Sequence, residues 1–261
     1  MKKIFLLVAF ALVVSAASAW HKNADAGMVV LATKHLTPEA KSVVEKHLGT
    51  AYEDDCGYIY YLERKKKSPY SKDVHFLHLD KNLQPANIEG DDALVALEKA
   101  MELLSNRESY SDAKVKETLR CVINLMCDIH NFSNIRIESV PHSYTDYSFM
   151  REKNEYVKTD YITYKWKSFW YKLSGSLAVF HPELWAEDME LCHGGKYAEM
   201  TKGTLRDWAA DNGTKAAGYY AKIYPDAVIT LREYLHMDFA NYDIIACAGF
   251  RLAALLNETI K

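Results

Sequence analysis

The chain has 261 residues and a formal net charge of −3, with 49% hydrophobic and 26% charged residues. These values are typical of a globular protein, and they exclude an intrinsically disordered, collagen-like or low-complexity chain. Because there is no basic excess, electrostatic capture of duplex DNA is not expected, and the length suits one large domain or two small ones.

The first predicted element is an export signal at residues 1–19. Two lysines follow the first Met, residues 4–14 are an unbroken apolar run, and residues 17–19 supply the small residues that signal peptidase accepts. A membrane anchor is the alternative, but the roughly 14 mostly apolar residues fall short of the ~20 that a spanning helix needs. We expect cleavage before Trp20, a mature chain without a transmembrane segment, and an exported product that is periplasmic or extracellular.

Helices are predicted along most of the mature chain, residues 20–261. Apolar residues recur at three- and four-residue spacing, the period of an amphipathic helix, in residues 26–35, 38–48, 91–104, 113–130, 204–224 and 244–256. Thr37 and Pro38 form a helix start, and Gly49 is a helix stop. No linker rich in Pro, Gly or Ser and no internal repeat divides the chain, which predicts one mostly helical domain.

Residues 132–163 differ from the rest because they lack a helical period and are rich in Ser, Asn, Thr and Tyr. Within them, residues 151–164 are interpreted as a hairpin with short strands at 155–157 and 161–163. The expected fold class is therefore mainly α, a single multi-helix domain with a small irregular or hairpin insertion.

The cysteine pattern leaves the pairing open. Export permits disulfides, and an odd number of cysteines allows at most two bridges. No Cys-x-x-Cys spacing exists, so a thiolate zinc site is not supported. Two of the cysteines lie six residues apart on different faces of a predicted helix and are not expected to pair with each other. The five are Cys56, Cys121, Cys127, Cys192 and Cys247.

Several sequence motifs follow one another in an order that is known from one enzyme family. They are Trp20 at the predicted mature N-terminus, residues 25–32 and 35–40, His75-Phe76-Leu77, residues 119–130, residues 165–171, and Ala248-Gly249-Phe250-Arg251-Leu252-Ala253. Over essentially the whole mature chain, this series resembles the S1/P1 nuclease family. Its members are secreted, mainly helical zinc enzymes that cut single-stranded nucleic acid, and they share their fold with zinc-dependent phospholipase C.

The resemblance implies a cleft with three zinc ions. In the family, the amine and carbonyl of the N-terminal Trp bind one zinc, and His and Asp side chains bind the rest. The zinc ions lower the pKa of a bound water and stabilise the transition state at phosphorus. Trp20, His75 and Asp128 fall on positions that keep the family's ligand, and Asp128 would be the catalytic residue if the protein were active.

The other ligand positions carry different residues. Asp25 stands where the family has His, and Glu63 is the carboxylate nearest to the family's Trp-Ala-Asp stretch. The remaining replacements exchange His for Asn124, Asn134 and Lys167, and Asp for Tyr171. The resemblance therefore implies a nuclease whose metal site has been extensively altered.

The replacements are poor zinc ligands. An Asn carbonyl is a neutral, hard oxygen better suited to Ca²⁺ or Mg²⁺, an ammonium has no lone pair to donate, and a Tyr is normally protonated. We expect the zinc cluster to be lost or reduced, and a hard cation held by Asp25, Asn124, Asp128 and Asn134 is an alternative. A further hypothesis is that the Lys167 ammonium takes the place of a zinc and neutralises Asp128.

Simpler structural roles remain open for the retained residues. His75 could be a hydrogen-bonded core histidine, Asp128 part of a structural ion pair, and Trp20 a packed core aromatic. His142 and Asp146 share a spacing of four residues and form a second candidate ligand pair, in the irregular segment.

The favoured function is a secreted pseudo-nuclease that keeps the fold and cleft for binding. Its ligand would be single-stranded nucleic acid, a nucleotide or a partner protein. The alternative is an active metal-dependent hydrolase of phosphodiester bonds with a reduced metal site. A lipid-headgroup hydrolase is a third hypothesis, which rests on fold analogy alone. Neither the ligand nor the oligomeric state follows from the sequence.

Overall fold

The computed structural model describes residues 20, 22–50, 72–86, 88, 92–154, 160–175 and 181–261. The predicted export signal, Cys56 and Glu63 therefore lie outside the described residues. The described chain is mainly helical, as predicted. Its helices are α1 (Lys22–Thr33), α2 (Pro38–Leu48), α4 (Ala93–Ser105), α5 (Asp112–His130), α6 (Trp166–Gly175), α7 (Pro182–His193), α8 (Tyr197–Met200), α9 (Leu205–Tyr220) and α10 (Leu231–Thr259).

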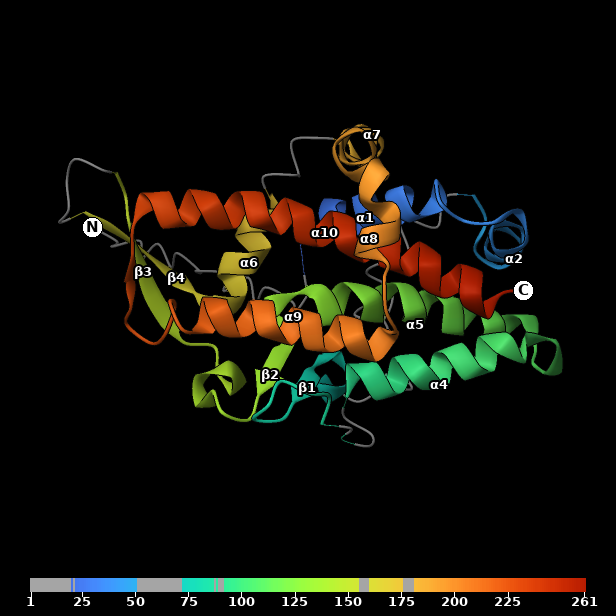
Figure 1. Cartoon of the computed structure of the whole chain (residues 1–261), viewed down its shortest axis with the longest axis horizontal. Helices are drawn as coiled ribbons and strands as arrows, with labels where there is room; N and C mark the ends of the chain where they lie inside the picture. Colours follow the sequence, from blue (N-terminus) through green and yellow to red (C-terminus); the bar gives the residue numbers. More distant parts are fainter. Residues whose placement is uncertain are drawn as a thin grey trace, which may run out of the picture.

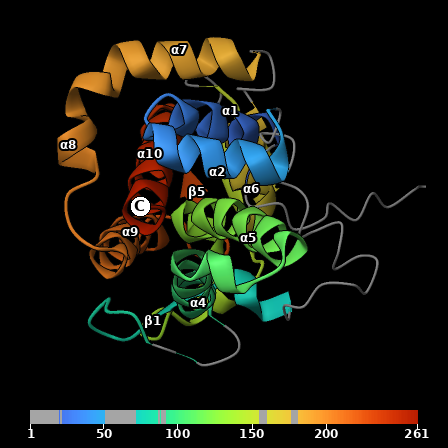
Figure 2. The same ribbon diagram turned by 90° about the vertical axis from the view of Figure 1, so that its right-hand side faces the viewer.

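Two long helices, α5 and α10, organise the core. Figure 1 shows α10 running along most of the molecule's length, with α9 and α5 on one side of it and α1 on the other. In the end-on view of Figure 2, α4 lies beside α5, and α1 and α2 lie close to α10. Most residues of α5 from Val115 onward and of α10 from Ile244 onward are buried, so the two helices supply much of the apolar core.

Helix α10 begins 13 residues before the predicted start at 244. The sequence pattern does not indicate this earlier start, because the N-terminal half of the helix carries polar residues among the apolar ones. Thr230 and Glu233 close a capping box there, in which each side chain accepts a hydrogen bond from the other's backbone N–H. By length and composition α10 is also apolar enough to cross a membrane, and 72% of its most apolar window is buried inside the protein. A buried core helix has the same composition, so the expected lack of a transmembrane segment stays a prediction.

Two small sheets join the helices. β1 (Leu77–Leu79) pairs in parallel with β2 (Ile135–Ile137). Strands of three residues are too short to show an alternating pattern in the sequence, so this pairing was not predicted. The second sheet has the order β4-β3-β5 and consists of β3 (Ser148–Glu152), β4 (Tyr161–Lys165) and β5 (Val228–Ile229).

The predicted hairpin is present, but its first strand was placed too late. β3 covers 148–152 and pairs antiparallel with β4, so that Glu152 faces Tyr161, whereas 155–159 lie outside the described residues. Side chains of β3 alternate between its two faces, and the buried face carries Phe149 and Arg151. Because Arg151 is charged, it does not read as an inward-facing residue in the sequence.

Helices α6 and α7 were not predicted. The carboxylate of Asp146 accepts a hydrogen bond from the backbone N–H of Lys167 and so caps α6 from outside its own segment. α7 lies against α1, where a Cβ on Gly27 would come within 2.5 Å of the Trp185 ring. Both helices therefore depend on contacts with distant parts of the chain.

Candidate functional site

The predicted ligand positions come from four parts of the fold. Trp20 is completely buried in the core, and Asp25 is buried on α1. Asn124 and Asp128 lie one turn apart on α5. Two further predicted ligand positions are the last residues of short 3-10 helices. His75 ends the helix Lys72–His75, and Asn134 ends the helix Phe132–Asn134, which comes shortly after α5.

His75, Asp128 and Asn134 form a compact group, here called the Asp128 cluster. The His75 Nδ1 lies 2.6 Å from one carboxylate oxygen of Asp128, and the Asn134 side-chain amide donates to the other at 2.8 Å. Asp128 is only 2% exposed. Because a carboxylate only accepts hydrogen bonds, the His75 Nδ1 carries a hydrogen and acts as donor. Both carboxylate oxygens thus have protein partners, as a buried charge requires.

The donor set differs from that of a three-zinc cluster at Asn134, whose amide nitrogen donates a hydrogen to Asp128 and offers no lone pair to a metal. His75 donates to Asp128 through Nδ1, an arrangement in which a histidine can still bind a metal through Nε2. In the part of the chain that the structure describes, no three His, Cys, Asp or Glu residues are grouped so that they could hold a metal ion. The described contacts are those of a hydrogen-bonded group centred on Asp128.

The predicted ion pair between Lys167 and Asp128 is not the arrangement found. The Lys167 ammonium lies 5.2 Å from the centroid of the Phe76 ring, and the Arg136 guanidinium lies 4.0 Å from the same centroid. Burial and the Arg136 charge lower the pKa of Lys167, against the opposing effect of Asp146. Asp128 is paired with His75 instead, because the imidazole reaches the carboxylate from the neighbouring 3-10 helix.

The other predicted residues have separate positions. Tyr171, on α6, is partly exposed. His142 Nε2 lies 3.2 Å from the Tyr220 carbonyl oxygen, and Asp146 caps α6, so the second candidate ligand pair serves two different elements.

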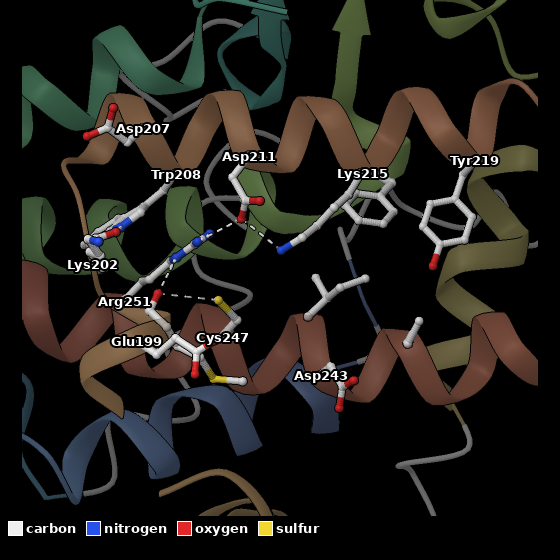
Figure 3. Close-up of a pocket in the computed structure, with 14 residues that line it drawn as sticks. Glu199, Lys202, Asp207, Trp208, Asp211, Lys215, Tyr219, Asp243, Cys247 and Arg251 are labelled. Atoms are coloured by element: carbon white, nitrogen blue, oxygen red, sulfur yellow. Dashed lines mark hydrogen bonds and ion pairs between the residues drawn. The ribbon is translucent and has the colours of Figure 1, made fainter. Parts of the chain in front are cut away.

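A second polar site, not predicted from the sequence, lies in a cavity of about 700 Å³ between α9 and α10. We call it the α9/α10 cavity. Figure 3 shows side chains from α9 and α10 facing each other across it. Its polar lining includes Asp211 and Lys215 from α9 and Arg251 from α10, and Trp208, Tyr219 and Ile244 contribute much of the apolar wall.

One carboxylate in this cavity holds two cations. Asp211 Oδ2 accepts a hydrogen bond from Arg251 Nη2 at 2.9 Å and another from Lys215 Nζ at 2.8 Å. Both contacts are drawn in Figure 3. Although burial would raise the pKa of Asp211, these hydrogen bonds hold it below its ordinary value. Arg251 also donates through Nε to the Met200 carbonyl at 3.0 Å, which fixes the guanidinium in place.

A buried, neutral histidine, His130, accepts a hydrogen bond from Arg251. His130 Nδ1 lies 2.9 Å from the Met126 carbonyl and therefore donates to it, so Nε2 remains as an acceptor for Arg251 Nη1 at 3.2 Å. Burial and the Arg251 charge lower the pKa of His130 to about 3. His130 had no functional role in the sequence interpretation, although its place at the end of α5 was predicted.

The described cysteines differ in their surroundings. No disulfide joins two of the described cysteines. Cys247 lines the α9/α10 cavity, and burial raises the pKa of its thiol, which disfavours the reactive thiolate. Cys192 is exposed on α7.

No protein-family model matches the chain, and no curated protein matches it. The resemblance to the S1/P1 nucleases therefore rests on the order and content of the motifs quoted above.

Proposed function

We propose that the protein is an exported S1/P1 nuclease-like protein, with the phospholipase C/P1 nuclease-like fold, that binds a ligand and has lost zinc-dependent catalysis. The observation that supports this most is the Asp128 cluster. Two residues that match metal ligands of the family, His75 and Asp128, are hydrogen-bonded to each other at 2.6 Å.

The replacement of most ligand positions is the reason to expect that catalysis is lost, and the cluster shows how Asp128 is accommodated. A buried carboxylate needs a partner of opposite charge or several hydrogen-bond donors. In a metal enzyme the cation provides this, whereas here the His75 imidazole and the Asn134 amide do so. His75, at a ligand position that is kept, and Asn134, at one that is replaced, thus give both carboxylate oxygens of Asp128 a partner.

The neighbouring side chains favour an anionic ligand. Phe76 directly follows His75, and its ring has the Arg136 guanidinium and the Lys167 ammonium close by. Arg136 is buried against the ring, so the half-buried Lys167 is the cation of this group that can meet a phosphate beside an aromatic ring, as in proteins that bind single-stranded nucleic acid. This supports nucleic acid or a nucleotide as the ligand, ahead of a partner protein.

The test combines metal content, cleavage and binding. We expect the purified protein to retain less than one zinc per chain after exposure to Zn²⁺, and to bind labelled single-stranded DNA or RNA without cutting it. Asp128→Asn should lower the free energy of unfolding by about 1–3 kcal/mol, because a buried charged hydrogen-bond partner is lost. Asp112→Asn, at a residue of the same helix whose side chain is 79% exposed, is the matched control and should change stability little.

Tightly bound zinc together with cleavage that Asp128→Asn abolishes would contradict the proposal. That result would establish the alternative, an active metal-dependent phosphodiesterase with a reduced metal site.

A further inference from the structure

The α9/α10 cavity lies apart from the Asp128 cluster. Asp128 and His130 are two residues apart on α5, so their side chains leave the helix about 200° apart. Asp128 faces His75, whereas His130 faces Arg251 at the cavity wall. An inference about the cavity therefore goes beyond the proposed function and does not depend on it.

The cavity has the size of a small-molecule site. Its volume of about 700 Å³ lies within the range of roughly 300–1,000 Å³ that is usual for ligand pockets. Residues of α9 at intervals of four, Asp211, Lys215 and Tyr219, form one side. Ala240 and Ile244 lie on the α10 side and provide an apolar surface.

One part of the cavity wall, made of Arg251, Lys215 and Asp211, has more positive than negative groups, although the whole lining also includes Glu199, Asp207, Asp243 and Lys202. Arg251 and Lys215 share the single carboxylate of Asp211, which leaves a net charge of one positive unit for these three groups. The Lys215 side chain is 45% exposed, and two of its three N–H donors remain available to a ligand.

The acidic residues of the lining other than Asp211 are exposed. Asp207 is exposed and is engaged in the capping box of α9 with Thr204. Asp243 lies 3.2 Å from His193, and Figure 3 shows it directed away from Lys215. Glu199 is also exposed, as is Lys202 of the same lining. The wall around Lys215 and Arg251 thus favours an anionic ligand. The carboxylates of Asp207, Asp243 and Glu199 are exposed to solvent, so they would bind a ligand amine only weakly.

We propose that the α9/α10 cavity binds a small organic carboxylate, with the anionic group on Lys215 and an apolar body along Ile244 and Ala240 toward Tyr219. Arg251 has a positioning role. Its hydrogen bond fixes the carboxylate of Asp211, and that carboxylate in turn orients the ammonium of Lys215. The apolar body can be aliphatic or aromatic, and the experiment distinguishes the two.

The experiment is calorimetric titration of the full mature chain with matched acid and amide pairs. Hexanoate and hexanamide form the aliphatic arm, and phenylacetate and phenylacetamide form the aromatic arm. In at least one arm we expect the acid to bind about tenfold or more tightly than the amide, since a charge-assisted hydrogen bond is involved. Added salt should weaken the binding of the acid and leave that of the amide unchanged.

Lys215→Gln should remove the preference for the acid over the amide. Lys41→Gln is the matched control, because Lys41 also pairs with an acidic residue four positions away, Glu45, and its side chain is 47% exposed. Ala240→Phe narrows the cavity without altering its charge and should weaken acid and amide alike.

Three results would overturn the inference. The first is that neither acid binds to the natural protein. The second is equal binding of acid and amide, or tighter binding of phenethylamine than of phenylacetate. The third is a preference for the acid that survives in Lys215→Gln while that variant keeps the natural circular-dichroism spectrum.

Discussion

The buried His130 gives this protein a stability that decreases in mild acid. In the folded protein the pKa of His130 is lowered to about 3, by burial first and by Arg251 second. In the unfolded chain an imidazole has a pKa of about 6.5. The perturbation that isolates this effect is His130→Gln, because Gln does not titrate and its amide oxygen can still accept from Arg251.

The sign and size follow from proton linkage. Between pH 6.5 and 3, the unfolded chain binds a proton at His130 that the folded protein does not bind. The free energy of unfolding therefore falls as the pH falls through this window, by up to about 1.4 kcal/mol per pH unit. Between pH 7 and pH 5 the free energy of unfolding falls by about 2 kcal/mol because of His130 alone. This fall is nearly the same for any folded-state pKa below ~4.

Urea unfolding at pH 7 and pH 5 measures this contribution. Other ionisable groups also change stability between these values, so the informative quantity is the difference between the natural protein and the variant. We expect His130→Gln to lose about 2 kcal/mol less than the natural protein on going from pH 7 to pH 5. At pH 7 the variant should be destabilised by ~1 kcal/mol, because the hydrogen bond to Met126 is altered.

His236→Gln, at an exposed position on α10, controls for the removal of a histidine as such. If His130→Gln lost as much stability between pH 7 and pH 5 as the natural protein does, the reasoning would be wrong. The imidazole would then be hydrated or already protonated in the folded state.

Further predictions concern the helices. Gly249→Ala should destabilise the protein by about 1–3 kcal/mol, because a Cβ there would lie 2.9 Å from the Met28 carbonyl oxygen. Gly218→Ala, with nothing within 4 Å of the added Cβ, should stabilise it by ~0.5–1 kcal/mol, and the reverse order of the two variants in thermal unfolding would refute this packing argument. Thr230→Ala should cost about 1 kcal/mol in urea unfolding, since it removes the acceptor for the Glu233 N–H, and no loss would mean that the capping box does not stabilise α10.

Local signals in the sequence were sufficient for several helices. The helix predicted at 38–48 agrees with α2, because Thr37, Pro38 and Gly49 mark its ends by local chemistry. The predicted 113–130 matches α5 to within one residue, since its apolar period is uninterrupted. By contrast, α6 is capped by Asp146, which lies outside its own segment. α7 has Pro182 at its start and Gly194 after its end, but its packing against Gly27 of α1 is a long-range contact that its own segment does not indicate.

The candidate sites divide in the same way. From its sequence context Asp128 was expected to need a partner, and the structure supplies His75 and Asn134 in place of the expected Lys167. Which partner reaches a carboxylate depends on where distant elements lie, and sequence spacing does not carry that information.

By itself, the sequence determined the mainly helical class and the helices with local caps or strong periodicity, and it predicted a set of residues at the positions of zinc ligands. The tertiary structure alone decided that two of those residues bond to each other, and that Lys215 and Arg251 share Asp211. Residues 215 and 251 lie on different helices. Their interaction with one carboxylate, and the cavity beside it, exist only because the core brings α9 and α10 face to face (Figure 3).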